Sequence, residues 1–399
     1  ENVQNDVQGT SSQYYPRKNW KFKFKADITY TESGRTSPTY ALRANSIPVN
    51  AFCVKADFAE SSGTHNTGMA KVINSLLIEM GLTTPPQKTN KEVRTTVDGY
   101  PIAIFHRETA SDTLEFVGKY NFNNDKSTAE TFGFSDGDES WEFSNNTSDR
   151  CLFKSADFSG TDWTNDFESR YPDDDAINAE YEAGTRKPEK LMAVTSWVVS
   201  TKDNLDKFKN EVRNHFNLDN LIAYYLITEL FGMVDQRAKN MFLTYFHEEG
   251  KWIFIFYDND TCFGLNNEGL IAFGYNIEYH DKIGTLNVWN GESSVLWNNL
   301  EKCFPSEIEA MYKDIRTRGL LSYDLIMSVL NGEQSDKWCE AIYNADGRFK
   351  YIDPLIEEGN GSYLYAAQGS RIENRKWWTY NRFLYIDSKY TAGSFLSDF

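Results

Sequence analysis

Cysteine and histidine are scarce in this chain, and long apolar runs are missing. Its 399 residues include 5 cysteines and 5 histidines. No Cys-x-x-Cys pair and no His-Glu-x-x-His pattern occurs, so the sequence offers neither a zinc site nor a disulfide framework, and we expect buried thiols. No stretch reaches the roughly 18 apolar residues needed to cross a bilayer, which excludes a membrane-spanning helix.

Positive charge is the second shortage. The chain carries 41 Lys and Arg residues against 58 Asp and Glu residues, which gives a net charge of −17. Such a protein repels a phosphate backbone, so nucleic acid is a poor partner. The length is sufficient for a large core and for two lobes, which excludes one small module. The sequence leaves the oligomeric state open.

Residues 1–133 are predicted to form a β-rich lobe. Apolar and basic residues alternate with period two in Trp20–Lys25, as in a half-buried strand. Shorter apolar runs predict strands at Ala51–Ala56 and Tyr100–Phe105, the second after an Asp-Gly turn signal. Between them, apolar residues at helical spacing predict a helix over Asn66–Met80.

The rest of the chain divides into a loop-rich segment and a mainly helical one. Residues 134–188 have weak periodicity and many Asp, Asn, Ser and Gly residues, which predicts a loop-rich insertion or connection. From 189 to 399 helical patterns dominate, and the most apolar of them, Leu218–Met233, is predicted to lie at the centre of a helical lobe. Strands are expected at Met241–Phe246 and Trp252–Tyr257, and further helices at Glu189–Ser200, Lys202–Phe216, from Val295 onward and at Arg371–Ser388. The predicted fold class is therefore α+β.

Four polar residues near the central helix and the second of these strands form a candidate active site. Asp235 follows the helix, Asn240 comes five residues later, and Asp258 and Asp260 follow the apolar strand. This set can hold Mg²⁺ and orient or deprotonate a hydroxyl, as phosphoryl transfer requires. Taken without the others, Asp235 and Asn240 fit ordinary turn geometry better. The two acids after the strand favour the active-site interpretation, because carboxylates next to an apolar strand are unfavourable unless a cation or a hydrogen-bond donor compensates them.

A second candidate region lies near the amino terminus. A turn rich in Gly, Ser and Thr can offer backbone N–H groups and hydroxyls to phosphate oxygens, and basic residues beyond it can balance the charge. Such short motifs are also common in ordinary loops, and a basic strand can be a solvated face. The candidate nucleotide-binding residues are Gly9, Thr10, Ser11, Ser12, Arg17 and Lys18.

In motif order the chain resembles the spore-coat protein H (CotH) kinase family. The motifs are Gln8-Gly-Thr-Ser-Ser with Pro16-Arg-Lys18, Lys55-Ala-Asp-Phe-Ala-Glu60 leading to Asn66, Asp235–Asn240, and Tyr257-Asp-Asn-Asp260 with Phe263-Gly264. The resemblance implies an atypical, two-lobed fold distantly similar to protein kinases. It also implies binding of ATP with Mg²⁺ or Mn²⁺ and phosphorylation of Ser or Thr on a protein partner. A spore coat, a cell surface, secretion or a virion is favoured over the cytoplasm as its location.

The resemblance further implies roles for individual residues. Asp235 would correspond to the catalytic acid, Asn240 and Asp258 to metal ligands, and Lys18 to the phosphate-contacting lysine.

Two positions fit the family pattern less directly. Asp260 is a further candidate metal ligand, although the family often has a hydrophobic residue where Asn259 stands. Glu60 is the candidate for an ion-pair glutamate, or it caps the helix that begins near Asn66.

Two other classes of function stay open. A binding protein that kept the fold and lost turnover could use the aromatic rings between Trp141 and Trp163, with Tyr171, to hold a carbohydrate or a protein surface. The alternative for these rings is ordinary core packing. A metal-stabilised structural component of a spore coat, virion or envelope is the third possibility.

Overall fold

The computed structural model describes residues 3–9, 17–29, 36–57, 64–265, 273–278, 293–332 and 370–391. Of the predicted site residues, Thr10, Ser11, Ser12 and Glu60 lie outside these ranges. Helices combine with antiparallel sheets, which confirms the α+β class. Among the helices of the described ranges, none combines the length and the apolar composition that a membrane span requires.

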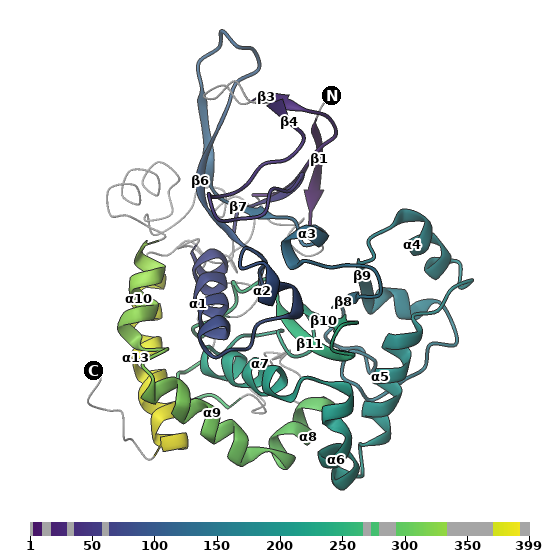
Figure 1. Cartoon of the computed structure of the whole chain (residues 1–399). Helices are drawn as coiled ribbons and strands as arrows, with labels where there is room; N and C mark the ends of the chain where they lie inside the picture. The colour runs from purple at the N-terminus through teal and green to yellow at the C-terminus, as the bar shows by residue number, and fades with distance from the viewer. Residues whose placement is uncertain are drawn as a thin grey trace.

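The first sheet has five antiparallel strands in the order β1-β2-β5-β7-β6 (Figure 1). Strand β2 pairs with β5 so that Trp20 faces Val54, which puts the start of β2 beside the end of β5. The last two strands extend above the rest of the molecule as a long hairpin. A small two-stranded sheet accompanies this one. The strands are β1 (Val3–Gln8), β2 (Asn19–Phe24), β3 (Ile28–Thr29), β4 (Thr36–Ser37), β5 (Ala51–Lys55), β6 (Gly99–His106) and β7 (Glu115–Asn124).

Helix α1 (His65–Glu79) follows the first sheet's central strand β5, within one residue of the predicted start. Its apolar residues at helical spacing are all buried, because they form the stripe that packs against the core. Two short helices lie nearby, α2 (Pro85–Thr89) and α3 (Ala129–Phe132). The first of these begins at Thr84 with a capping box, in which Thr84 and Gln87 satisfy each other's backbone N–H groups.

The second sheet contains two strands from the segment expected to be rich in loops. Its order is β11-β10-β8-β9, with β10 (Met241–Phe246) and β11 (Lys251–Phe256) close to the predicted bounds. Strands β8 (Glu139–Phe143) and β9 (Phe167–Tyr171) lacked a sequence signal, because they are five residues long and β8 is buried on both faces, so no alternation is visible. The same segment holds η2 (Asp162–Asn165) and α4 (Asp175–Glu182).

The aromatic residues of this segment belong to the core. Trp141 and Trp163 are each 1 % exposed, and both rings pack edge-on against Tyr181. Core packing therefore explains these two tryptophans, and they cannot offer flat rings to a ligand at the surface.

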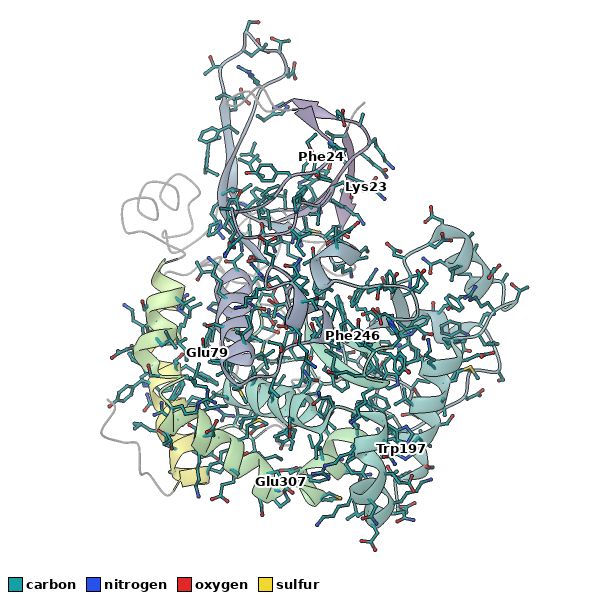
Figure 2. All side chains as sticks on the ribbon, in the orientation of Figure 1. Lys23, Phe24, Glu79, Trp197, Phe246 and Glu307 are labelled. Atoms are coloured by element: carbon teal, nitrogen blue, oxygen red, sulfur yellow. The ribbon has the colours of Figure 1, made fainter. Side chains whose placement is uncertain are left out.

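Helices make up most of the remainder and lie below and beside the second sheet (Figure 1). Side chains fill the centre around Phe246, whereas Glu79 and Glu307 lie at the surface (Figure 2). The helices are α5 (Glu189–Ser200), α6 (Leu205–His215), α7 (Leu218–Leu230), α8 (Val295–Cys303), α9 (Pro305–Thr317), α10 (Tyr323–Gly332) and α13 (Ser370–Thr391).

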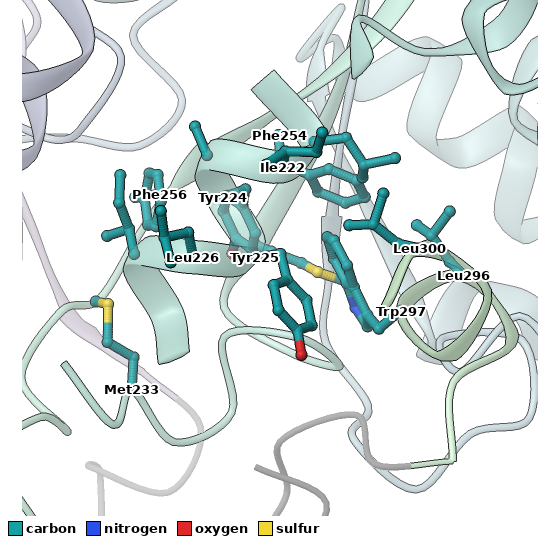
Figure 3. Packing of buried hydrophobic residues seen from close by; sticks show 14 of the residues in the cluster. Ile222, Tyr224, Tyr225, Leu226, Met233, Phe254, Phe256, Leu296, Trp297 and Leu300 are labelled. Atoms are coloured by element: carbon teal, nitrogen blue, oxygen red, sulfur yellow. The ribbon is translucent and has the colours of Figure 1, made fainter. Parts of the chain in front are cut away.

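Helix α7 is the central helix that the sequence predicts, and nearly all of it is buried. Tyr224 stacks on Phe256 of β11, with ring centroids 4.2 Å apart, and on Trp297 of α8 at 5.6 Å (Figure 3). The helix ends at Leu230 rather than at Met233. Gly232 takes a positive φ of 55°, and Met233 N–H donates to the Thr228 carbonyl, so a Schellman motif ends the helix before the apolar run ends.

Candidate active site

Two segments that are about twenty residues apart in sequence lie side by side beyond α7 and β11. Val234 N–H donates to the Thr261 carbonyl at 3.0 Å, and the Thr261 hydroxyl donates back to the Val234 carbonyl at 2.9 Å. The Gln236 side chain donates to the backbone carbonyls of Tyr257 and Asp258, at 2.5 and 3.0 Å. These bonds hold the loop that carries Asp235 against the acids that follow β11.

Three of the predicted site residues share an uncommon backbone conformation. Asp235, Asn240 and Asp258 have φ values of 72°, 53° and 57°. A left-handed conformation is rare for residues other than glycine and persists only where surrounding contacts impose it. The loop between Asp235 and Asn240 is therefore fixed at both ends by its packing.

Lys55, the last residue of β5, forms an ion pair with Asp258. Its Nζ lies 2.5 Å from Asp258 Oδ1, and the two side chains are 8 % and 27 % exposed. This contact joins the first sheet to the segment that follows the second sheet. Lys55 lies within one of the family motifs but was not predicted as a site residue, although a lysine that ends a fully buried strand was a usable signal.

The ion pair keeps both partners charged. Burial by itself lowers the pKa of Lys55, but attraction to Asp258, and then to other acids that include Asp260 and Asp57, raises it well above its ordinary value. Burial likewise raises the pKa of Asp258, but Lys55 outweighs this effect, and with Asn66 and Lys126 it holds the pKa below its ordinary value. The Asp258 carboxylate is therefore ionised at neutral pH and available to a cation.

A hydrogen-bond network of buried amides and carboxylates holds Asp258 in place. Asn66, at the start of α1, donates to Asp57 at 3.1 Å and to Asp258 at 3.4 Å, and its oxygen accepts from Asn259 N–H at 2.7 Å. Asn121 donates to the other oxygen of Asp57. Asp57 also has a positive φ, 44°. The network connects β5, α1 and β7 with the candidate metal ligand.

A pocket opens beside this ion pair. The ammonium groups of Lys55 and Lys126 each lie 4.9 Å from the ring centroid of Tyr257. Of these two lysines only Lys55 lines the pocket, since Lys126 pairs with Glu142 at 2.7 Å. A lysine at the pocket suits an anionic ligand such as a phosphate group. The pocket is lined by Cys53, Lys55, Asn66, Val97, Asn123, Asn124, Tyr257, Asp258 and Asn259.

Asp235 is 2 % exposed and accepts a hydrogen bond from Asn146 Nδ2 at 3.0 Å. Within the described ranges the Asn240 side chain makes no hydrogen bond, while its N–H donates to the Phe143 carbonyl at 3.1 Å. The structure thus brings Asp235 and Asn240 close to β8. It also adds Asn146, which no local pattern marked because the contact spans 89 positions.

The amino-terminal candidates border the same end of the first sheet. Gly9 directly follows β1 with a φ of 98°, and Arg17 and Lys18 directly precede β2. Strand β1 pairs with β2 so that Gln8 faces Asn19, whose side chain accepts from Ala56 N–H at 2.8 Å. Their role in nucleotide binding stays a prediction.

The candidate metal ligands carry carboxylate and amide oxygens, the donor types that a hard divalent cation prefers. No group of three or more His, Cys, Asp or Glu side chains in the described part of the chain could hold an ion by itself. Mg²⁺ is usually bound through one or two carboxylates together with substrate phosphates, so Asp258 with the amide oxygen of Asn240 is a suitable protein contribution.

Among curated proteins, none matches the chain significantly. A family model described as CotH kinase protein matches residues 122–322, which is just over half of the 399 residues. The matched region includes Asp235, Asn240, Asp258 and Asp260, whereas Lys55 lies before it. The chain therefore belongs to the CotH kinase family.

Proposed function

We propose that this protein transfers the γ-phosphoryl group of ATP to a Ser or Thr hydroxyl of a protein substrate. The observation that carries the proposal is the ion pair between Lys55 and Asp258, two residues that line one pocket. Gln236, the residue after Asp235, donates to the Asp258 carbonyl at 3.0 Å. A buried lysine and an ionised carboxylate that face one space suit a phosphate group and the cation that accompanies it. Membership of the CotH kinase family supports the same chemistry.

Each residue has a defined part in this proposal. Lys55 contacts phosphate oxygens, together with Gly9 and Lys18. Asp258 and Asn240 hold Mg²⁺ or Mn²⁺, with Asp260 as a further ligand, and the ion when bound neutralises charge on the phosphates. Asp235 orients the acceptor hydroxyl and accepts its proton.

We further propose that the chain forms two lobes as in other kinases, with the nucleotide between them. Residues 1–133 would form the nucleotide-binding lobe, residues 134–188 an insertion, and residues 189–399 the lobe that carries the acids. The contact between β5 and the segment after β11 supports this division. Strand β8 makes the boundary between insertion and second lobe less sharp, since β8 belongs to the insertion and pairs with β10 of that lobe.

Labelled ATP tests the proposal directly. The full chain is incubated with γ-labelled ATP, Mn²⁺ or Mg²⁺ and casein as acceptor, and phosphorylated residues are mapped. We expect metal-dependent label on Ser or Thr. Asp235→Asn should reduce transfer by about 10²- to 10⁴-fold, because an amide cannot accept the proton, while ATP still binds. Transfer that survives this substitution would show that Asp235 is structural.

A further inference from the structure

The loop that follows β8 reaches the candidate catalytic acid. Asn146 Nδ2 donates to Asp235 Oδ1 at 3.0 Å, and the Phe143 carbonyl, three residues earlier, accepts from Asn240 N–H at 3.1 Å. The end of β8 and the loop after it therefore contact the two ends of the segment 235–240. Both belong to the insertion, to which the proposed function assigns no role.

The loop is held rigidly by contacts on either side of Asn146. Asn145 Nδ2 and Arg150 Nη1 donate to the two carboxylate oxygens of Asp166, at 3.0 and 2.6 Å, and Asp166 is 4 % exposed. The Asn145 oxygen also accepts from Thr147 N–H at 3.2 Å. Asn146 lies between Asn145 and Arg150, and the contacts of these two residues hold the loop independently of the bond between Asn146 and Asp235.

An amide is a suitable partner for a carboxylate that must accept a proton. It fixes the direction of one oxygen and supplies no positive charge, whereas a lysine or arginine would oppose protonation far more strongly. Asp235 is almost fully buried and its backbone has a φ of 72°, so few other orientations are open to it once this bond is made.

We propose that Asn146 is a positioning residue, which holds the Asp235 carboxylate in the orientation that accepts the proton of the acceptor hydroxyl. The inference rests on the proposed phosphotransfer. It assigns to the insertion a part in catalysis that requires no contact with either substrate.

The test compares four forms of the full chain: wild type, Asn146→Ala, Asn146→Asp and Asn178→Ala. Asn178, on α4 in the same insertion, also donates its amide to an acid, Asp173 at 3.5 Å, and it serves as the matched control. For each form, kcat and KM for ATP are measured from pH 5 to 9 with Mn²⁺ and casein. Thermal unfolding with and without ATP and Mn²⁺ reports folding and nucleotide binding separately.

We expect Asn146→Ala to lower kcat by about 10-fold, the scale of one hydrogen bond to a charged group, with KM for ATP within about 2-fold of wild type. The acidic limb of its kcat profile should move upward by about half a pH unit, because a carboxylate that loses one hydrogen-bond donor is protonated more easily. Asn146→Asp should move that limb further, since two acids would share the site. Asn178→Ala should behave as wild type.

Three results would overturn the inference. The first is an active wild type whose acidic limb is unchanged in both Asn146 variants. The second is a parallel loss of ATP binding and thermal stability in Asn146→Ala, which would make the residue structural. A wild type without any transfer would remove the proposed function and this inference together, and so is distinguished from the other two.

Discussion

At the scale of single residues, Lys55 is the side chain on which the candidate site depends most. It is 8 % exposed, contacts Asp258 at 2.5 Å and lies over the ring of Tyr257. The family resemblance assigns the role of phosphate-contacting lysine to Lys18. The two lysines lie at the same end of the first sheet, because β2 and β5 are paired, and a substitution can separate their contributions.

We therefore expect Lys55→Met to weaken ATP binding by about 1.5–3 kcal/mol, the scale of a charge-assisted hydrogen bond. Lys18→Met should weaken it by less, since it is Lys55 that lines the pocket beside Asp258. Titration with ATP and with adenosine, monitored by calorimetry, measures both effects. Adenosine has no phosphates and should bind each variant as it binds the wild type. If a variant lost as much affinity for adenosine as for ATP, the result would contradict a phosphate contact.

Asp258 gives a second prediction at this scale. Asp258→Asn removes a charged ligand of the cation, so the rise in melting temperature caused by ATP with Mg²⁺ should disappear. Asp98→Asn is the matched control, because Asp98 is also a buried acid paired with a cation, Arg43 at 2.7 Å. That variant should lose stability and keep the shift. An unchanged shift in Asp258→Asn would remove the metal-ligand assignment.

At the scale of elements, the end of α7 decides where Asp235 stands. Helical hydrophobicity continues to Met233, but the Schellman motif at Gly232 turns the chain away from the helix axis. The chain can then run beside Thr261 and bring Asp235 near the acids after β11. A Cβ at Gly232 would lie 2.9 Å from the indole of Trp378 on α13, so glycine is required there for space as well as for its φ of 55°.

Gly232→Ala should accordingly lower the free energy of unfolding by about 2–4 kcal/mol, through the left-handed backbone and the contact with Trp378. Gly319→Ala is the control, since Gly319 has a similar φ of 66° and an added Cβ there meets nothing within 4 Å. Gly319→Ala should lower the free energy of unfolding by only about 1–2 kcal/mol, because only the left-handed backbone conformation disfavours alanine there. Urea denaturation measures both values. If both variants lost the same free energy of unfolding, Trp378 would have moved aside without an energetic penalty, which would contradict the prediction.

At the scale of the whole molecule, ion pairs among the described residues link the amino-terminal third to the segment around β11, and two of them differ in exposure. Lys55 pairs with Asp258 in a largely buried place, while Lys88 and Glu249 pair at 2.7 Å with side chains 56 % and 26 % exposed. Solvent screens the second pair, so its contribution should be about 0–1 kcal/mol. The first should contribute about 1–3 kcal/mol, less than a fully buried pair because Asp258 keeps some exposure.

These two pairs predict different dependence on pH. The pKa of Asp258 is lowered from its usual 3.8 in the folded protein, so the carboxylate stabilises the fold above about pH 4. This stability is lost as pH falls through the lower folded pKa. The difference in unfolding free energy between wild type and Lys55→Met should therefore be largest above about pH 5 and shrink toward pH 3. Lys88→Met should stay close to wild type at every pH. A constant difference for Lys55→Met would contradict the ionic coupling.

The sequence by itself determined the features that depend on neighbours along the chain. Helical spacing predicted α1 and α5, apolar runs predicted β10 and β11, and the acids Asp235 and Asp258 were identified because each follows such a run. The order of the short motifs was sufficient to recognise the CotH kinase family. The information that predicted the helices and strands lies within about twenty residues of each feature, the range over which periodicity and caps act.

Only the tertiary structure decided which distant residues meet. Lys55 and Asp258 are 203 positions apart, and Asn146 and Asp235 are 89 positions apart. Strand β8 shows no alternation because it is buried on both faces, so its place in the second sheet could not be predicted from local pattern. Contacts of this kind depend on strand order and register. A single sequence does not display them, because pairing is selected by the packing of the complete fold.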